Sequence, residues 1–146
     1  MEQDKMNIGF RLKCINNMIR RKLDTEFAKT GLEEIVGMQG PMIGYIYDKS
    51  RERDVFQRDL EKVFNIRRST ATVMLQTLEQ KGFIIRETVE HDARLKKIVL
   101  TDKAVEQHMV IKRQIDIFHE KLEQGITPEE KEEFFRILDK ITQNLQ

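Results

Sequence analysis

The sequence of 146 residues has little of what marks secretion, membrane insertion or loosely linked domains. Its single cysteine, Cys14, excludes an intrachain disulfide and a zinc site built on several thiolates. No apolar run approaches the roughly 20 residues that cross a bilayer, and no signal peptide is evident. Two prolines and no Gly/Ser-rich stretch leave no flexible linker. We therefore expect one continuous cytoplasmic body with no membrane partner.

Motifs for catalysis and for metal binding are also missing. The sequence contains no P-loop, nucleophile elbow, His-Glu-x-x-His motif or glycine fingerprint, so it does not indicate an enzyme or a cofactor. His108 and His119 would lie roughly 16 Å apart along one helix, which is too far to share a metal ion. The total charge is +1, from 26 basic and 25 acidic residues, and favours no class of partner.

Apolar residues recur every three or four positions at both ends of the chain. The first such pattern runs from Ile8 to Phe27, with Gly31 as a stop, and a broad apolar face there needs a large surface to pack against, another subunit included. Near the other end, Thr101 is a plausible cap for a helix that extends to about residue 124. After Gly125, a capping box at 127–130 begins the last helix, which carries one apolar face.

The middle of the chain predicts three shorter helices, over about 38–47, 57–64 and 67–81, followed by a β-hairpin. The strands are predicted at 83–89 and 98–101, separated by a long polar tip at 90–97. Two short helices joined by a tight turn and followed by a hairpin have the order of a winged helix-turn-helix, whose second helix enters the major groove of DNA.

The distribution of charge supports this interpretation. No acidic residue occurs between Glu61 and Glu79, as expected of a surface that faces a polyanion. The predicted DNA-contacting residues of the second helix and its amino end are Arg67, Arg68, Ser69, Thr70, Thr72, Val73 and Gln76.

The hairpin supplies a second basic cluster. Three cations, Arg94, Lys96 and Lys97, fall within four positions of the polar tip. An arginine on such a wing can enter the minor groove, and Asp92 is spaced to hold its guanidinium in place. We therefore expect these four residues to contact DNA. A plain solubilising turn is the alternative for the tip.

Specific motifs add a resemblance to a known family. These are Phe64 to Thr72, Leu78 to Ile84, the Asp-x-Arg of Asp92 to Arg94, and an apolar strand that ends with Leu100-Thr101. They resemble the core of the MarR family of bacterial transcriptional regulators. Two positions depart from the family pattern: Arg67 stands where a capping residue is usual, and Gly37 stands where Ser or Thr commonly starts the second helix, predicted here over about 38–47.

The resemblance implies a mainly α-helical fold with a small β-hairpin, in a single domain over 1–146. It implies a winged helix-turn-helix lobe at 35–101 and dimerisation helices at 1–34 and 102–146. It further implies a homodimer that binds a pseudo-palindromic operator in double-stranded DNA. Such proteins usually repress transcription, and a small-molecule effector or an oxidant relieves the repression.

Two other functions stay open from the sequence. The winged lobe could bind a protein and not DNA, through its hairpin or its second helix. Cys14 occupies a position similar to that of the reactive thiol in peroxide-sensing members of the family, although a small apolar residue in a dimer interface is the commoner role of such a cysteine.

Overall fold

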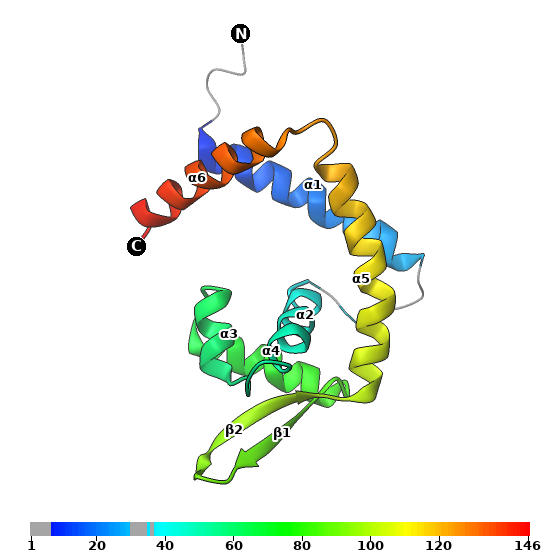
Figure 1. Ribbon diagram of the computed structural model, residues 1–146, viewed down its shortest axis with the longest axis vertical. Helices are drawn as coiled ribbons and strands as arrows, with labels where there is room; N and C mark the ends of the chain where they lie inside the picture. Colours follow the sequence, from blue (N-terminus) through cyan, green and yellow to red (C-terminus); the bar gives the residue numbers. More distant parts are fainter. Residues whose placement is uncertain (1–6, 30–34, 36) are drawn as a thin grey trace. The chain divides into compact units, whose positions relative to one another are not determined.

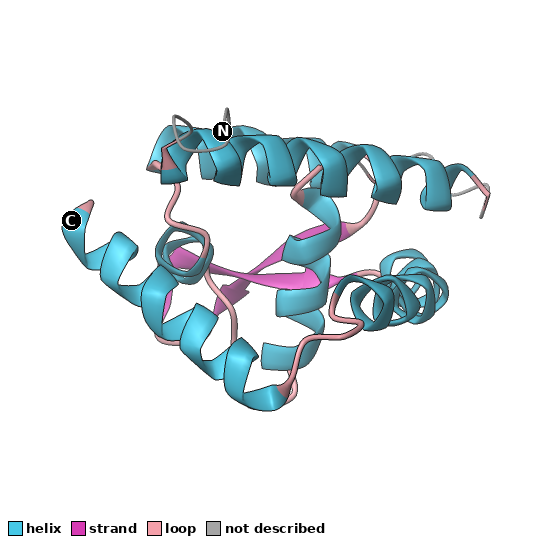
Figure 2. Cartoon of the chain, turned by 90° about the horizontal axis from the view of Figure 1, so that it is seen from above, coloured by secondary structure: helices cyan, strands magenta, loops and turns pink. Residues whose placement is uncertain are grey.

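The computed structural model describes residues 7–29, 35 and 37–146, which form helices and a single antiparallel hairpin (Figures 1 and 2). Six helices occur in the described residues: α1 (Ile8–Ala28), α2 (Gln39–Lys49), α3 (Gln57–Val63), α4 (Arg68–Gln80), α5 (Asp102–Leu122) and α6 (Pro128–Asn144). The strands are β1 (Ile84–Val89) and β2 (Asp92–Leu100). The chain divides into two compact units, residues 1–115 and 116–146. The predicted fold class is confirmed, whereas Gly31 lies outside the described residues.

The core of the first unit forms where α2, α3 and α4 meet the start of the hairpin. Met42, Ile46, Leu60, Leu75 and Phe83 are fully buried there. They come from three helices and from the residue that precedes β1, so burial of their apolar surface fixes the helix-turn-helix against the wing.

The ends of these helices follow from local chemistry. Asn65 takes a left-handed backbone conformation, with φ of 48°, in the turn between α3 and α4. Gly82 does the same after α4, with φ of 74°, a conformation that costs glycine little. The Thr101 hydroxyl accepts the backbone N–H of Ala104 at 3.3 Å and donates to the Gly82 carbonyl at 2.6 Å. Thr101 therefore caps α5 as expected and ties its start to the end of α4.

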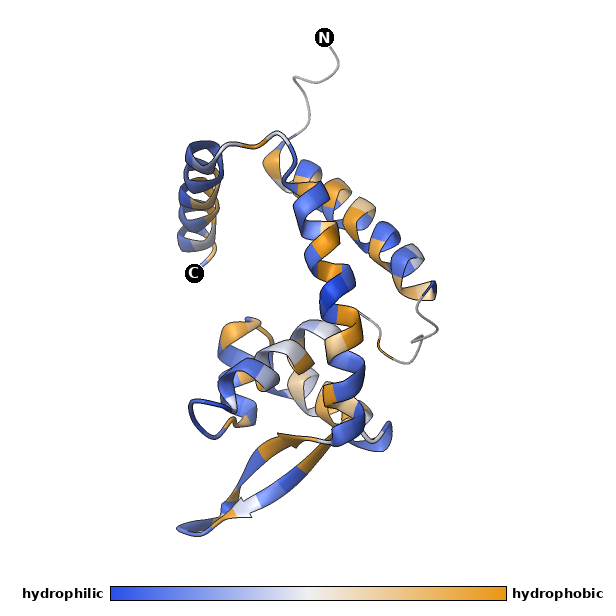
Figure 3. Ribbon diagram, turned by 45° about the vertical axis from the view of Figure 1, so that its right-hand side comes forward, coloured by the Kyte–Doolittle hydropathy of each residue, from blue (hydrophilic) through white to orange (hydrophobic). Residues whose placement is uncertain are grey.

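The wing differs from the sequence prediction. Residues 92–97 were expected in a long loop, but they belong to β2, and only Glu90 and His91 separate the strands. Glu87 pairs with Lys97 and Thr88 with Lys96 across the ribbon, so these polar residues extend the ladder. Strand periodicity is weak here because residues 92–97 hold only two apolar side chains, Ala93 and Leu95, and none of the six residues is buried. The hairpin extends away from α2, α3 and α4, with a hydrophilic far end (Figures 1 and 3).

The second unit consists of the end of α5 and helix α6. Thr127 and Glu130 form the predicted capping box, in which each side chain accepts the other residue's backbone N–H, at 2.9 and 3.2 Å. No residue of α6 is buried, although Phe134, Phe135 and Ile137 are apolar. Helix α6 therefore leaves an apolar face uncovered within its own unit.

Candidate nucleic-acid interface

Helix α4 has one buried side and one exposed side. Ala71, Leu75 and Leu78 are fully buried against the core, which fixes the rotation of the helix about its axis. The opposite side is exposed and carries residues predicted from the sequence: Ser69, Thr70, Val73 and Gln76. Arg67 and Arg68 are exposed at the amino end, so all six side chains are open to a partner.

Thr72, the remaining predicted residue of α4, lies differently. Its side chain is half-buried between α3 and α4, and its hydroxyl accepts a hydrogen bond from Gln57 Nε2 at 2.9 Å. The same hydroxyl donates to the backbone carbonyl of Arg68 at 2.9 Å. The Thr72 hydroxyl therefore joins the two helices. Gln57 was not identified from the sequence, because its partner lies 15 residues further along the chain.

The amino end of α4 lacks a side-chain cap. Arg67 occupies the N-cap position with extended backbone, and its side chain accepts no hydrogen bond from the first turn. An arginine has no acceptor to offer, so the departure from the family pattern has the expected local effect. The first-turn N–H groups are open to an external acceptor, beside the cations of Arg67 and Arg68.

Asp92 has a different role from the one predicted. Its carboxylate accepts the backbone N–H of Arg94 at 2.9 Å, and does not hold the Arg94 guanidinium. The bond falls next to an irregularity in the strand pairing, between Thr88 and Val89. A carboxylate two residues before an N–H readily forms such a local turn. Asp92 thus shapes the backbone at the tip, and Arg94 is exposed.

A cleft of about 480 Å³ separates α3 and the start of α4 from the wing. Five cationic side chains line it: Arg58, Arg68, Arg86, Arg94 and Lys96. Glu61 is the only carboxylate in its lining. Lys97, the other predicted cation of the wing, is not part of this lining and pairs instead with Asp54 at 3.7 Å and Glu87 at 3.8 Å.

Arg58 and Arg86 in this cleft were not predicted. Arg58 lies on α3 and stacks on Phe56, with its guanidinium carbon 5.2 Å from the ring centroid. Arg86 lies on β1, and its Nε is 3.8 Å from a carboxylate oxygen of Glu79. Each belongs to a segment without a basic run, so only the folded chain brings them beside Arg68 and Arg94.

A charged cluster secures the start of α3. Asp59 Oδ2 accepts the backbone N–H of Phe56 at 2.8 Å and Arg53 Nη1 at 3.0 Å. Arg53 also donates to the Tyr45 hydroxyl at 3.4 Å. Burial raises the pKa of Asp59, but the hydrogen bonds from Arg53 and Phe56 outweigh it, so that the pKa lies below its ordinary value. The cluster connects α2 to α3.

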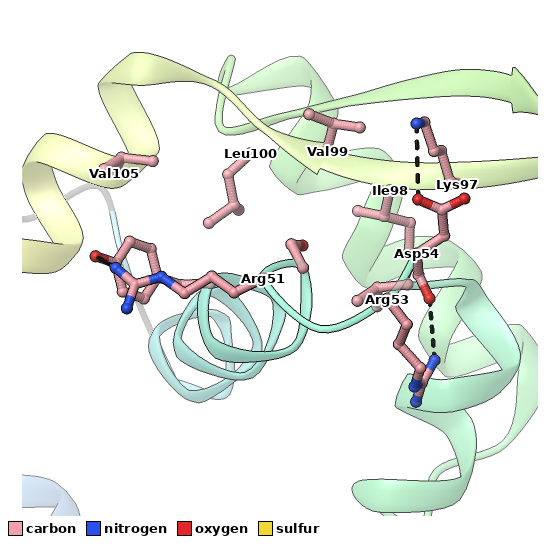
Figure 4. Close-up of a pocket in the computed structure, with 11 residues that line it drawn as sticks. Arg51, Arg53, Asp54, Lys97, Ile98, Val99, Leu100 and Val105 are labelled. Carbon is pink, nitrogen blue, oxygen red and sulfur yellow. Dashed lines mark hydrogen bonds and ion pairs between the residues drawn. The ribbon is translucent and has the colours of Figure 1, made fainter.

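A second pocket, of about 360 Å³, lies between the end of α2, β2 and the start of α5 (Figure 4). Ile98, Leu100 and Val105 supply apolar surface, and Arg51 faces Leu100 across the space. The Arg51 guanidinium stacks over the Tyr47 ring, 4.3 Å from its centroid, and donates to the Tyr47 hydroxyl. Arg51 forms no ion pair with any described carboxylate.

Other candidate groups show no site of their own. Cys14 is half-buried on α1 and forms no hydrogen bond with a described residue. Within the described part of the chain, no three His, Cys, Asp or Glu side chains gather closely enough to hold a metal ion. No helix over the described ranges is both long and apolar enough to cross a membrane.

The helix pair α3–α4, the hairpin and the cationic cleft define a winged helix-turn-helix protein of the transcription-regulator class. The chain belongs to the MarR family, whose model matches residues 37–95. The family is one of transcriptional regulators.

Three comparisons support this assignment. The transcription regulator MarR from Oenococcus oeni PSU-1 is 31% identical, with a TM-score of 0.79 over 94% of this chain and 99% of that one. The S. aureus MepR–DNA complex shares the fold, with 24% identity and a TM-score of 0.84 over 96% and 97% of the two chains. The uncharacterized HTH-type transcriptional regulator YybA of Bacillus subtilis (strain 168) is 27% identical over 92 residues, 63% of this chain and 61% of YybA.

Proposed function

We propose that this protein is a sequence-specific DNA-binding regulator that acts as a homodimer on a pseudo-palindromic operator. The cleft lined by Arg58, Arg68, Arg86, Arg94 and Lys96 carries the proposal. The five cations repel one another and Glu61 is the only carboxylate beside them in the cleft, so a phosphate backbone passing between them would relieve this repulsion. The MepR–DNA complex shows that a protein with this fold can accommodate a duplex.

In this proposal, α4 lies in the major groove and the wing reaches the adjacent minor groove. Arg67, Arg68 and the open first-turn N–H groups of α4 hold a phosphate at the helix end. Ser69, Thr70, Val73 and Gln76 face base edges, whereas Thr72 supports the helix from behind. Arg94 enters the minor groove, Asp92 fixes its backbone, and Lys96 and Lys97 contribute positive charge.

Fluorescence anisotropy on duplexes selected from a random-sequence library tests the DNA-binding proposal. We expect affinity to fall steeply with salt, and Arg94→Ala and Arg86→Ala each to reduce the salt slope by about one released counterion per subunit. Arg113→Ala is a matched control, because this exposed arginine of α5 lies outside the cleft. If selection recovers no duplex that the protein binds in a salt-sensitive manner, DNA binding is refuted.

Uncovered apolar surface on the terminal helices favours the homodimer. No described residue of α1 or α6 is buried, and both helices carry large apolar side chains. The exposed ones include Phe10, Met18, Phe134 and Phe135. A second copy would remove this surface from water, as an obligate dimer does. Sedimentation equilibrium should give twice the chain mass at micromolar concentration, and a monomer would refute this part.

We further propose that DNA binding represses transcription and that a small ligand in the pocket of Figure 4 modulates it. The pocket joins α2, the wing strand β2 and the start of α5, so a bound molecule would contact both the wing and the helix that follows it. Three cations line the pocket; Arg53 and Lys97 pair with Asp59 and Asp54, whereas Arg51 pairs with no described carboxylate. The apolar floor and the Arg51 cation therefore suit a small molecule with a flat apolar body and one negative charge.

Benzoate and its neutral analogue benzamide test this pocket. Benzoate at millimolar concentration should raise the melting temperature and weaken DNA binding, and benzamide should do neither. Arg51→Leu should abolish the benzoate effect, whereas Arg113→Leu should preserve it. Equal effects of the two compounds, or an undiminished benzoate effect in Arg51→Leu, would refute the proposed ligand class.

A reporter gene fused to the regulated promoter tests repression. Expression of the reporter that rises when the gene for this protein is deleted would support repression, and expression that falls would contradict it.

Two simple experiments separate the alternatives. A protein-docking module would keep its interaction after charge reversal at Arg67, Arg68 and Arg94, whereas the DNA-binding protein loses its affinity. A thiol sensor would lose its peroxide response in Cys14→Ser. The hydroxyls of Tyr45 and Tyr47 accept hydrogen bonds from arginines, and Cys14 forms no hydrogen bond with a described residue, so no contact among the described residues supports an activated thiol.

A further inference from the structure

One apolar side chain stands in the polar outer surface of α4. Val73 is 61% exposed, although the other apolar residues at the centre of this helix are buried or half-buried. Its neighbours on the same stripe, four positions before and three positions after, are Ser69 and Gln76. Val73 therefore lies at the middle of the surface that faces outward from the helix-turn-helix.

The fold does not account for a valine at this position. Ala71 and Leu75, two positions away on either side, are fully buried, so Val73 points away from the core. Valine is a weaker helix former than alanine, glutamine or lysine, because the turn restricts its branched side chain. An exposed valine at a helix centre therefore gains nothing from packing in this chain and costs helix propensity.

The hydroxyls next to Val73 are already used within the protein. Thr72 binds Gln57 and the Arg68 carbonyl, and the Thr77 hydroxyl donates to the backbone carbonyl of Val73 at 3.0 Å. Around Val73, the side chains of Ser69 and Gln76 form no hydrogen bond with a described residue. The centre of the surface thus presents an apolar contact flanked by polar ones.

We propose that Val73 is a specificity-determining residue that reads the 5-methyl group of a thymine in the major groove. The inference rests on the proposed DNA-binding function. Among the four bases only thymine offers a methyl group at the major-groove edge, and apolar side chains recognise it by contact. With 61% of Val73 exposed on the outer side of α4, its side chain is open to such a contact, which would account for an apolar residue at this position.

The test replaces thymine by deoxyuridine, which removes only the methyl group and keeps the Watson–Crick edge. The duplex is one recovered by selection from a random-sequence library, and each thymine of a half-site is replaced in turn. One position should weaken binding by about fourfold, the value of burying one methyl group. Val73→Ala should bind thymine and uracil duplexes with equal affinity, and Val73→Thr, which keeps one γ-methyl, should restore part of the difference.

Val63→Ala is the matched control, because this valine is 53% exposed at the end of α3 and lies outside the α4 stripe. It should preserve the full thymine preference. The inference is overturned if no thymine position discriminates, or if wild type and Val73→Ala lose the same affinity on uracil substitution, since the effect then comes from the DNA. Loss of this preference alone leaves DNA binding intact, whereas absence of any salt-sensitive binding by the wild type overturns both proposals.

Discussion

The hydrogen bond between Gln57 and Thr72 makes a prediction about stability that can be measured without DNA. Gln57 Nε2 donates to Thr72 Oγ1 at 2.9 Å across the two helices, in a half-buried position. Gln57→Leu removes the donor at similar volume, and Thr72→Val removes the acceptor. One such bond contributes about 1 kcal/mol to the free energy of unfolding. For a chain of this size, that corresponds to roughly 3 °C in melting temperature.

Urea denaturation of the wild type, the two single variants and the double variant gives the coupling energy. Each single change also removes a hydrogen bond to the Arg68 carbonyl, from Thr72 Oγ1 at 2.9 Å and from Gln57 Nε2 at 3.4 Å, so Thr72→Val, which loses the shorter bond, should cost more. The double variant should be more stable than the sum of the two losses predicts, by about 1 kcal/mol. Strictly additive losses would refute the reasoning, since they would show that the two side chains do not interact in solution.

The same variants decide what Thr72 does on DNA. If its hydroxyl only supports α4, Gln57→Leu and Thr72→Val both weaken binding to all sequences and leave the selected sequence unchanged. If the hydroxyl reads a base, Thr72→Val alone changes the selected sequence. The second outcome would agree with the sequence prediction that Thr72 contacts DNA.

Three further predictions concern stability and assembly. Asp59→Asn should lower the melting temperature near neutral pH. Folding lowers the pKa of Asp59, so the stabilising effect of its carboxylate is present above about pH 4 and is lost as pH falls through the folded-state pKa. The melting temperatures of the wild type and the variant should therefore converge in acid. Leu75→Ala should reduce the free energy of unfolding by about 2 to 5 kcal/mol in urea titrations, because Leu75 is fully buried, and a loss below 1 kcal/mol would contradict the core described here. Phe134→Asp should shift the sedimentation mass toward that of the monomer while far-ultraviolet circular dichroism stays unchanged. An unaltered mass would show that α6 does not contribute to the dimer interface.

Much of the fold was predictable because its signals are local. Apolar spacing, Gly82, Gly125, and the caps at Thr101 and Thr127 are properties of short segments, and the helices begin and end within about two residues of the predictions. The wing was predicted less well. Residues 92–97 of β2 hold only two apolar side chains and none that is buried, so the sequence there lacks the alternation that marks a half-buried strand.

The candidate site was predictable only where its residues are adjacent in the chain. The basic end of α4 and the cations of the wing are each a cluster of residues adjacent in the sequence. Arg58 and Arg86 are distant from both clusters in the sequence, and only folding brings them into the same cleft. The predicted partner of the Asp92 carboxylate, the Arg94 guanidinium, was wrong; the carboxylate binds the backbone N–H of Arg94. Spacing placed the carboxylate near Arg94, but a short side chain reaches the backbone N–H more readily than a long, mobile guanidinium.

The sequence by itself determined the order of the helices and hairpin, the absence of carboxylates between Glu61 and Glu79, and the resemblance to a family. These are one-dimensional properties, set by periodicity, capping and residue type. Only the tertiary structure decided which of the predicted residues face outward. Burial of Ala71 and Leu75 fixes the rotation of α4, and that rotation turns Thr72 toward Gln57 and leaves Val73 exposed.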